Sequence, residues 1–394
     1  MLIKSTIGEV CKKLQTGKTP PSKEKKYFNG TVNWYTPTDL NKRLLKQSKR
    51  TITALAYEDK KAMKYPKGTV LLSCIGDIGK IGIITDNQSS SNQQITGLIP
   101  DLSKITTQYL YYWCREHKSL LESKSTSVTL PMLNNKRLSK IKISYEEDLN
   151  KQKRIANILT QVEALISKRE ESIELLDALL RSSFLDMFGD PVLNPKKLSK
   201  IKISQFASVQ TGSTPSRKKI SKYYMNGQYN WVKTTEVKNQ KIYETEEKIT
   251  LDAINESNCK LFPKSTVLIA MYGQGKTRGR VGILLEESAT NQACAGIIPN
   301  KKYDSVFLFY QLQYLYNHLR SLGRGGGQPN LNLNLVKNYE VISPLSEENS
   351  NIKKFSTIVK QVETTKEQYQ NSLDELRHLF GSLSQRAFRG ELDL

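Results

Sequence analysis

The chain has 394 residues, 38% of them hydrophobic and 25% charged, and its formal net charge is +22. This length allows two or more domains with cores of their own, and the composition excludes a wholly disordered chain. A charge this positive favours a polyanionic partner such as nucleic acid, although a role in solubility alone is the simpler interpretation.

The sequence gives no signal for a membrane or a metal. It has no run of about 18 uncharged apolar residues, and residues 1–10 lack the apolar stretch of a signal peptide. We therefore expect a cytoplasmic protein. The five cysteines and three histidines are scattered and form no CxxC pair, so we expect reduced thiols and no metal site.

Residues 1–145 are predicted to form a first mixed α/β domain, rich in short strands. Glycine-containing turns between Thr69 and Ile84 interrupt runs of β-branched residues, which is typical of short strands joined by tight connections. A helix rich in leucine and tyrosine is expected from Gln108 to Leu121.

Residues 146–190 are predicted to form a long central helix. Apolar side chains recur from Ile155 to Leu180 at alternating steps of four and three, which is the seam of a coiled coil, and Arg169 is its one polar interruption. At about 1.5 Å per residue, a helix over 151–188 would be roughly 55 Å long, enough to hold two domains apart.

Capping signals mark both ends of this helix. Ser144 and Glu147 have the spacing of a capping box at its start. Gly189 and Pro191 are the expected stop signals at its end.

Residues 191–345 are predicted to repeat the first domain, because the same short motifs return in the same order about 200 residues later. A second set of glycine-containing turns spans Thr266 to Leu285, and a helix is expected from Val306 to Leu322. A period this long indicates a duplicated domain-plus-helix unit rather than a solenoid. The matched segments are Gln15–Pro20 with Gln210–Pro215, Phe28–Gly30 with Met225–Gly227, Asn33–Trp34 with Asn230–Trp231, Pro66–Leu71 with Pro263–Leu268, Lys80–Ile83 with Arg280–Ile283, Asn92–Gln93 with Asn291–Gln292, and Gly97–Pro100 with Gly296–Pro299.

Residues 346–394 are predicted to form a second seam helix, at an offset of 200 from the first. Lys366 is its polar interruption and Gly390 its stop signal. Gly381 lies inside it, where glycine weakens a helix by about 1 kcal/mol relative to alanine. The expected seam residues of the two helices are Ile155, Leu159, Val162, Ile166, Ile173, Leu176 and Leu180, and Phe355, Val359, Val362, Tyr369, Leu373, Leu376 and Phe380.

The two predicted helices are almost neutral. Residues 151–188 hold six basic and six acidic side chains, and residues 353–388 hold six and four, so together they carry +2 of the +22. The remaining +20 lies mainly on the repeated domains, which are therefore the expected phosphate-facing surfaces, with the helices as a scaffold. Two different basic domains on a rigid spacer are suited to reading the two half-sites of an asymmetric DNA site.

In this order the motifs resemble the specificity subunit of Type I restriction-modification systems, over nearly all 394 residues. Two departures are Thr234–Val237, a weaker match than its counterpart in the first domain, and Gly381. The resemblance implies an α+β fold: two mixed α/β target-recognition domains, related as a pseudo-two-fold repeat and separated by two long antiparallel coiled-coil helices. The segments that carry it are Thr16–Pro20 and Thr211–Pro215, Trp34–Leu40 and Trp231–Val237, Asn92–Gln93 and Asn291–Gln292, Met187–Pro191, and Arg386–Leu392.

The resemblance also implies a non-catalytic subunit that binds an asymmetric two-part DNA site and directs its partners there. Those partners are two adenine methyltransferase subunits, which use S-adenosylmethionine, and restriction subunits, which use ATP and Mg²⁺, so no cofactor is expected in this chain. In agreement, we find no methyltransferase motif, helicase signature or catalytic cluster. The outer faces of the helices, around residues 151–154 and 353–354, are expected to dock the methyltransferases, or else the helices only pack against each other.

Two other functions stay open. Gly273–Thr277 ends like a phosphate-binding loop, as in a nucleotide hydrolase, but Ala270 stands where that loop requires its first glycine. The third possibility is a DNA-binding or structural coiled-coil protein that works without an enzyme partner.

Residues that differ between the two domains are the expected base readers, because domains that read different sequences share architecture rather than readout. We therefore favour core positions for Trp34 and Trp231. For the two Asn-Gln pairs we favour shared architecture or shared phosphate contacts over base reading. The loops at 124–129 and 323–329 are expected readers, whereas the basic side chains at 276–280 are equally compatible with a solvated tight hairpin. The candidate DNA contacts are Lys18, Thr19, Thr36, Lys80, Lys124, Ser213, Lys276, Arg278, Arg280, Arg324 and Gln328.

Overall fold

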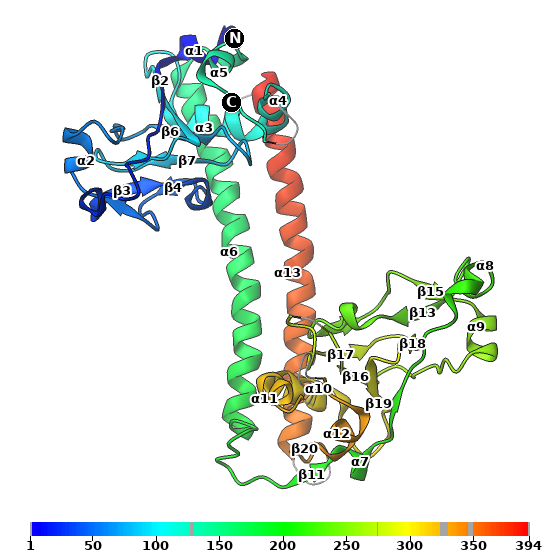
Figure 1. Ribbon diagram of the computed structural model, residues 1–394. Helices are drawn as coiled ribbons and strands as arrows, with labels where there is room; N and C mark the ends of the chain where they lie inside the picture. The colour runs from blue at the N-terminus through cyan, green and yellow to red at the C-terminus, as the bar shows by residue number, and fades with distance from the viewer. Residues whose placement is uncertain (1, 127–129, 274, 324–329, 346–349, 393–394) are drawn as a thin grey trace. The chain divides into compact units, whose positions relative to one another are not determined.

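The computed structural model describes residues 2–126, 130–273, 275–323, 330–345 and 350–392, and the chain divides into two compact units. The first unit holds residues 1–171 and 369–394, and the second holds residues 172–368. Two long helices, α6 (Leu149–Phe188) and α13 (Ser350–Arg389), each contribute to both units (Figure 1). Each unit is therefore one sheet domain with part of each long helix.

The sheet domain of the first unit is built on a five-stranded sheet in the order β2-β9-β6-β7-β4, with β4 and β7 parallel and the other neighbours antiparallel. A three-stranded sheet, β5-β3-β8, and a two-stranded sheet, β1-β10, complete it. The strands are β1 (Leu2–Thr6), β2 (Cys11–Thr16), β3 (Phe28–Tyr35), β4 (Leu44–Leu45), β5 (Thr51–Ile52), β6 (Val70–Ser73), β7 (Ile81–Ile84), β8 (Ser90–Ser91), β9 (Ile95–Pro100) and β10 (Lys142–Glu146). The helices are α1 (Ile7–Val10), α2 (Leu55–Glu58), α3 (Thr107–Glu116), α4 (Lys118–Ser123) and α5 (Asn135–Ser139), with 3₁₀ turns at Lys25–Tyr27 and Pro37–Asp39.

The central strand β6 is buried along its whole length because both faces of its sheet are covered. Val70 and Leu72 belong to one core, which they share with Trp113 of α3. Leu71, between them, belongs to a second core with Tyr35. This alternation follows the period of two expected of a strand.

The second unit repeats this topology strand for strand, as the sequence repeat predicts. Its sheets have the orders β12-β19-β16-β17-β14, β15-β13-β18 and β11-β20. The registers also agree, because Val70 pairs with Ile83 in the first unit and Val267 pairs with Ile283 in the second. The strands are β11 (Lys200–Lys202), β12 (Val209–Thr211), β13 (Tyr229–Val232), β14 (Gln240–Ile242), β15 (Lys248–Ile249), β16 (Val267–Ala270), β17 (Val281–Leu284), β18 (Ser288–Thr290), β19 (Cys294–Ile297) and β20 (Glu340–Ile342). The helices are α7 (Ile203–Phe206), α8 (Ile220–Tyr223), α9 (Leu251–Glu256), α10 (Ser305–Tyr314), α11 (Tyr316–Ser321) and α12 (Leu333–Asn338), with 3₁₀ turns at Arg217–Lys219 and Thr234–Glu236.

The single helices predicted over 108–121 and 306–322 are each two helices, α3 with α4 and α10 with α11. In the first unit the break falls at His117, where the backbone leaves the helical region at φ −95° and ψ 27°. The His117 amide donates to the Trp113 carbonyl, and its ring Nδ1 lies 2.9 Å from the same oxygen. The break redirects α4 so that Leu121 is buried in the core.

The predicted capping box at the start of α6 is wrong. Ser144 lies within β10, opposite Lys4, because pairing with β1 keeps this segment extended. The helix begins at Leu149, and the Asp148 carboxylate accepts the amide of Asn150 at 2.8 Å.

The predicted ends of both long helices are confirmed. Gly189 and Gly390 directly follow α6 and α13, each with a φ of 76°, the left-handed conformation that glycine adopts freely. Helix α13 is continuous through Gly381. Of the helices in the described residues, none is both long and apolar enough to cross a bilayer.

Within each unit the two long helices run antiparallel. In the first unit Ile155, near the start of α6, shares a core with Phe388, near the end of α13. In the second unit Leu180, late in α6, shares a core with Phe355, early in α13. The fourteen expected seam residues are all buried or half-buried. Phe184 is fully buried in the same core and was not among them.

Candidate nucleic-acid interface

A repeated Thr-Gly-x-Thr-Pro loop follows β2 in the first unit and β12 in the second. In the first unit the Gly17 amide donates to the Ile95 carbonyl, and the Lys18 amide to the Ser91 carbonyl, both at 2.9 Å. A Cβ on Gly17 would lie 2.2 Å from the carbonyl oxygen of Asn92, so only glycine fits here. The glycine shared by the two repeats is therefore architectural.

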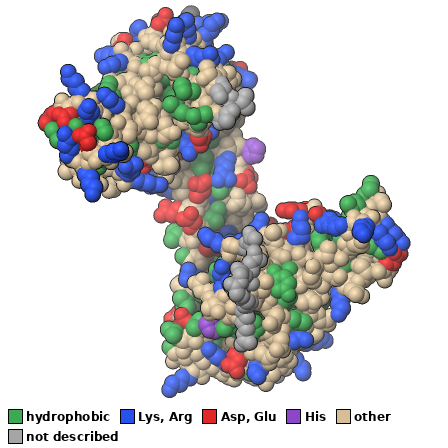
Figure 2. Space-filling model, in the orientation of Figure 1, with side chains coloured by type: hydrophobic (Ala, Val, Ile, Leu, Met, Phe, Trp, Pro, Cys, Tyr) green, Lys and Arg blue, Asp and Glu red, His purple; other side chains and the backbone are tan. Residues whose placement is uncertain are grey.

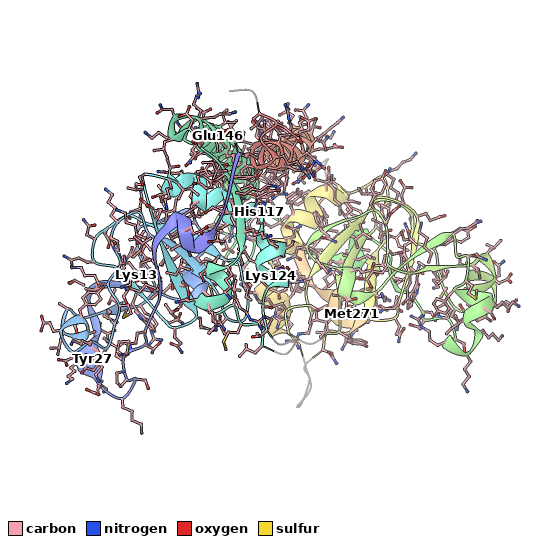
Figure 3. The ribbon with its side chains drawn as sticks, turned by 90° about the horizontal axis from the view of Figure 1, so that it is seen from above. Lys13, Tyr27, His117, Lys124, Glu146 and Met271 are labelled. Atoms are coloured by element: carbon pink, nitrogen blue, oxygen red, sulfur yellow. The ribbon has the colours of Figure 1, made fainter. Side chains whose placement is uncertain are left out.

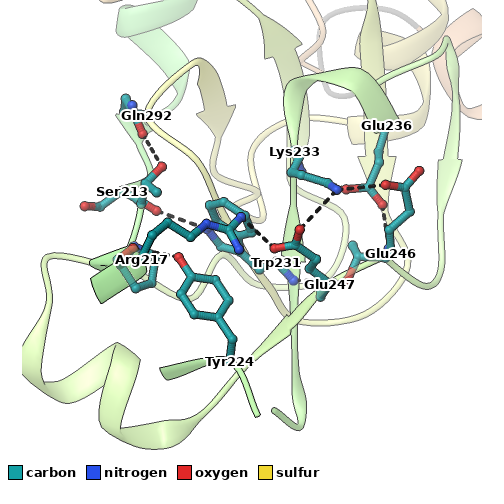
Figure 4. Close-up of polar contacts among 12 residues, drawn as sticks. Ser213, Arg217, Tyr224, Trp231, Lys233, Glu236, Glu246, Glu247 and Gln292 are labelled. Carbon is teal, nitrogen blue, oxygen red and sulfur yellow. Dashed lines mark hydrogen bonds and ion pairs between the residues drawn. The ribbon is translucent and has the colours of Figure 1, made fainter. Parts of the chain in front are cut away.

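A buried tryptophan in each unit donates a hydrogen bond to the same loop. The indole Nε1 of Trp34 donates to the Lys18 carbonyl at 3.3 Å, and that of Trp231 donates to the Ser213 carbonyl at 3.0 Å (Figure 4). Both tryptophans are only 2% exposed, which confirms the predicted core positions.

The glutamine of each Asn-Gln pair also bonds this loop. The side-chain oxygens of Gln93 and Gln292 accept from the hydroxyls of Thr19 and Thr214, the latter at 2.6 Å. The side-chain amide of Asn92 donates to Gln94 at 2.8 Å. These side chains form hydrogen bonds within their own domain, which supports an architectural role for them. The Thr19 hydroxyl is likewise used in a hydrogen bond within the domain.

The other candidate DNA contacts near this loop differ in the exposure and hydrogen bonding of their side chains. Lys18 is exposed, and its ammonium donates to the Lys60 carbonyl at 2.7 Å. Ser213 occupies the same position of the second loop. The Thr36 hydroxyl donates to the Asp39 carboxylate at 2.7 Å and so belongs to a local cap.

The backbone beside each tryptophan is held in the same way, which aligns the two domains residue by residue. The amide of Trp34 donates to the Ser48 hydroxyl at 3.0 Å, and that of Trp231 donates to the Thr245 hydroxyl at 3.1 Å. Residues 49–50 of the first domain therefore correspond to residues 246–247 of the second.

These aligned positions carry opposite charges. Arg50 lies over the Trp34 ring, with its guanidinium carbon 5.2 Å from the centroid. In the second domain Glu247 stands at that position, and it pairs at 2.7 Å with Arg217, whose guanidinium lies 5.3 Å from the Trp231 ring. A cation covers the tryptophan in both domains, and of these two cations only Arg217 has an ion pair within the described part of the chain.

A second ion pair extends this network in the second domain (Figure 4). The Lys233 ammonium lies 2.7 Å from Glu246 and 3.5 Å from Glu247. The hydrogen bond with Glu246 raises the pKa of Lys233 and lowers the pKa of Glu246. Figure 2 agrees, since it shows basic and acidic side chains side by side around α8 and α9.

The turn from β6 to β7 carries Lys80, and the turn from β16 to β17 carries residues 275–280. The Lys80 ammonium pairs with Asp77 at 3.0 Å, and this bond lowers the pKa of the Asp77 carboxyl. Lys276 is exposed and Arg280 half-buried.

Arg320 of α11 donates hydrogen bonds to the turn between β16 and β17. Its guanidinium donates to the carbonyls of Gly275 at 2.8 Å and Arg278 at 2.9 Å, and Arg278 donates back to the Arg320 carbonyl at 3.4 Å. Because Thr277 leads into strand β17, the described part of this turn joins two antiparallel strands. A nucleotide-binding loop of the type considered above leads instead into a helix N-terminus.

Lys124 follows α4 and is exposed. The loop that begins there is tied to the β6–β7 turn, because the Gly76 amide donates to the Pro131 carbonyl at 2.9 Å. The structure therefore brings together the turn that carries Lys80 and the loop that begins at Lys124. Arg324 and Gln328, with residues 127–129, lie outside the described residues.

Glu163, which was not among the expected site residues, ties the first sheet domain to α6. Its carboxylate pairs with Arg43 at 3.2 Å and with Arg115, and it accepts from the Tyr112 hydroxyl at 3.0 Å. Burial raises the pKa of Tyr112, which keeps its hydroxyl protonated as a donor.

Glu363 of α13 does the same in the second unit. It pairs with Lys241 and accepts from the Tyr310 hydroxyl at 3.3 Å. A signal for both glutamates exists in the sequence, because Gln-Val-Glu occurs at 161–163 and again at 361–363.

Comparison with known proteins shows which family shares this sequence pattern. The family model described as the Type I restriction modification DNA specificity domain matches residues 3–175 and again residues 195–375. The chain is 25% identical over 362 residues to the Type I restriction enzyme MjaIX specificity subunit of Methanocaldococcus jannaschii, covering 86% of this chain and 81% of that protein. It is 24% identical over 333 residues to the MjaVIII specificity subunit of the same organism, covering 77% and 74%.

Solved structures show the same fold. The S subunit of a Type I restriction-modification system from M. genitalium aligns with a TM-score of 0.61 at 16% identity, covering 100% of this chain and 97% of that one. A second structure comes from work on complex assembly and conformational transition of the type I R-M system. It also aligns with a TM-score of 0.61, at 15% identity, and the alignment covers 99% of this chain and 98% of that one.

Proposed function

The chain belongs to the family of Type I restriction-modification DNA specificity subunits, and we propose that it reads one asymmetric DNA site in two parts, one through each target-recognition domain. It is a DNA-recognition component and not a catalytic subunit. The observation that carries the proposal is that one fold is built twice, with the same internal braces and different exposed side chains.

The differences fall on residue types that can read base edges. Arginine pairs bidentately with guanine, whereas glutamate accepts from the amino group of cytosine. Arg50 and Glu247 stand at equivalent positions, and so do Lys18 and Ser213. Two domains with different chemistry at equivalent positions suit a site whose halves differ in sequence.

The proposed partners are two adenine methyltransferase subunits and the restriction subunits of the same system, acting in the cytoplasm. S-adenosylmethionine, ATP and Mg²⁺ would be bound by those subunits. Within the second unit, Leu175 and Leu179 of α6 lie one turn apart and are 61% and 48% exposed, which suits packing against a methyltransferase helix. Of the basic residues expected to dock a partner, Lys151 is already paired with Glu146 at 3.2 Å.

Adenine-methylation mapping of the source strain, with and without this gene, tests the proposal. We expect a methylated motif with two separated parts that disappears on deletion and returns on complementation. Persistence of every methylated motif, with the proposed methyltransferase partner expressed in both strains, would refute the proposal.

A further inference from the structure

The two units have pockets at equivalent places in the fold. In the first unit the pocket lies between α4, α5 and the start of β10, with a volume of about 570 Å³. In the second it lies between α11, α12 and the start of β20, with a volume of about 330 Å³. The local structure is equivalent too. The side chains of Asn134 and Asn332 accept a backbone amide at the start of α5 and of α12, respectively.

The two pockets differ in the lysines and arginines that line them, four in the first and only Lys200 among those described in the second. Four cationic side chains line the first, whereas the equivalent positions of the second are neutral or acidic. Those cations are all exposed, and within the described residues none of them takes part in an ion pair. The cations are Lys124, Arg137, Lys140 and Lys142, and their counterparts, each 198 residues later, are Leu322, Leu335, Asn338 and Glu340.

Cations gathered without a counter-charge repel one another, so this cluster is stabilised when a polyanion lies against it. The apolar part of the pocket is Leu120 and Ile141, and among its described lining residues there is no aromatic ring on which a base could stack. These features favour phosphate groups over a free nucleotide.

The cluster also continues the candidate interface. Lys124, labelled in Figure 3, begins the loop whose Pro131 carbonyl accepts the Gly76 amide of the β6–β7 turn. The Arg137 guanidinium donates to the Lys124 carbonyl at 3.4 Å, which holds α5 beside this loop.

We propose that Lys124, Arg137, Lys140 and Lys142 bind phosphates of the DNA backbone. The first domain then anchors the duplex independently of sequence, and the second has no such anchor at the equivalent place. This inference rests on the proposed function, namely that the chain binds DNA.

The test uses the complex of this chain with its methyltransferase subunits and measures duplex affinity against NaCl concentration. The variant K124A/K140A/K142A removes three charges and keeps Arg137. A matched control, K264A/K301A/K302A, removes three exposed lysines of the second unit. Both variants are measured on DNA with the methylated motif and on scrambled DNA.

We expect the slope of log affinity against log salt to fall by about 0.9 for each phosphate that is no longer bound, so by roughly 2 to 3 in the variant, and to stay unchanged in the control. Affinity should fall by the same factor on both DNAs, which leaves the preference for the motif intact. A slope equal to that of the control overturns the inference. Failure to associate with the methyltransferase, at an unchanged slope, also overturns it and assigns the cluster to a protein partner. Failure of the wild-type complex to prefer its motif would instead count against the proposed function.

Discussion

Arg169 of α6 lies over the ring of Tyr369 of α13, with its guanidinium carbon 4.2 Å from the ring centroid. The two residues occupy the same position of the two helical repeats, 200 residues apart. The polar interruption of the first seam is therefore a contact between the two repeats, because a cation over an aromatic face is attracted to it. Lys366, the interruption of the second seam, also has a partner, Asp177, at 2.6 Å.

Replacing Arg169 by alanine is expected to lower the free energy of unfolding by about 1 kcal/mol, since this contact is half-buried. Arg169→Lys should retain part of that stability. Chemical denaturation measures the effect, and Arg154→Ala, an exposed arginine of the same helix, is the control. Equal midpoints for the two alanine variants would contradict the role given to Arg169.

Glu163→Gln is expected to lower the free energy of unfolding by about 1 to 3 kcal/mol, because Arg43 loses its charged partner while its side chain is only 21% exposed. Glu363→Gln should act in the same direction in the second unit. Thermal unfolding followed by circular dichroism measures both. Glu171→Gln, on the exposed side of α6, serves as control, and a loss in that variant as large as in Glu163→Gln would show that the ion pairs are not the cause.

Gly17→Ala is expected to destabilise the first domain by about 1 to 3 kcal/mol, because the new Cβ meets the backbone oxygen of Asn92, which cannot move independently. Gly381→Ala is the comparison, since a Cβ there has open space and helix propensity favours alanine by about 1 kcal/mol. Urea unfolding of the two variants should therefore shift the midpoint in opposite directions. A shift in the same direction would be inconsistent with the roles given to the two glycines.

Stability should decline at alkaline pH. Burial raises the pKa of the Cys11 thiol to about 12 and that of Cys74 to about 11, whereas an unfolded cysteine titrates near about 8.5. A thiol with a higher pKa in the folded state contributes stability that is complete below the unfolded value and is lost as pH rises toward the folded one. We expect the free energy of unfolding to fall between about pH 8.5 and 11. Urea titrations at several pH values check this, and a smaller fall is expected in C11A/C74A than in the wild type.

The features predicted well from sequence are those encoded by periodicity and repetition. Predicting the seam from Ile155 to Leu180 requires only the local helical period. The correspondence of β6 with β16 follows because Val70 and Val267 stand in the same repeated motif. The stop at Gly189 is also local, since it depends on one residue's conformational freedom.

The features missed depend on partners distant in sequence. Ser144 has the right spacing for a cap, but pairing of β10 with β1 keeps it extended. Glu163 is an ordinary charged position on a helix until the fold brings Arg43 to it across 120 residues. The four cations of the first pocket include Lys124, which the sequence suggested, and Arg137, which only the position of α5 reveals.

The most direct measurement of the central claim is the exchange of one recognition domain. Residues 191–345 would be replaced by the corresponding domain of a family member whose half-site is known, and adenine methylation mapped in a strain that lacks the native gene. We predict that one half of the methylated motif changes to the donor's half-site, while the other half is retained. Methylation in which both halves change together, or in which neither changes, would contradict the account that each domain reads its own half-site.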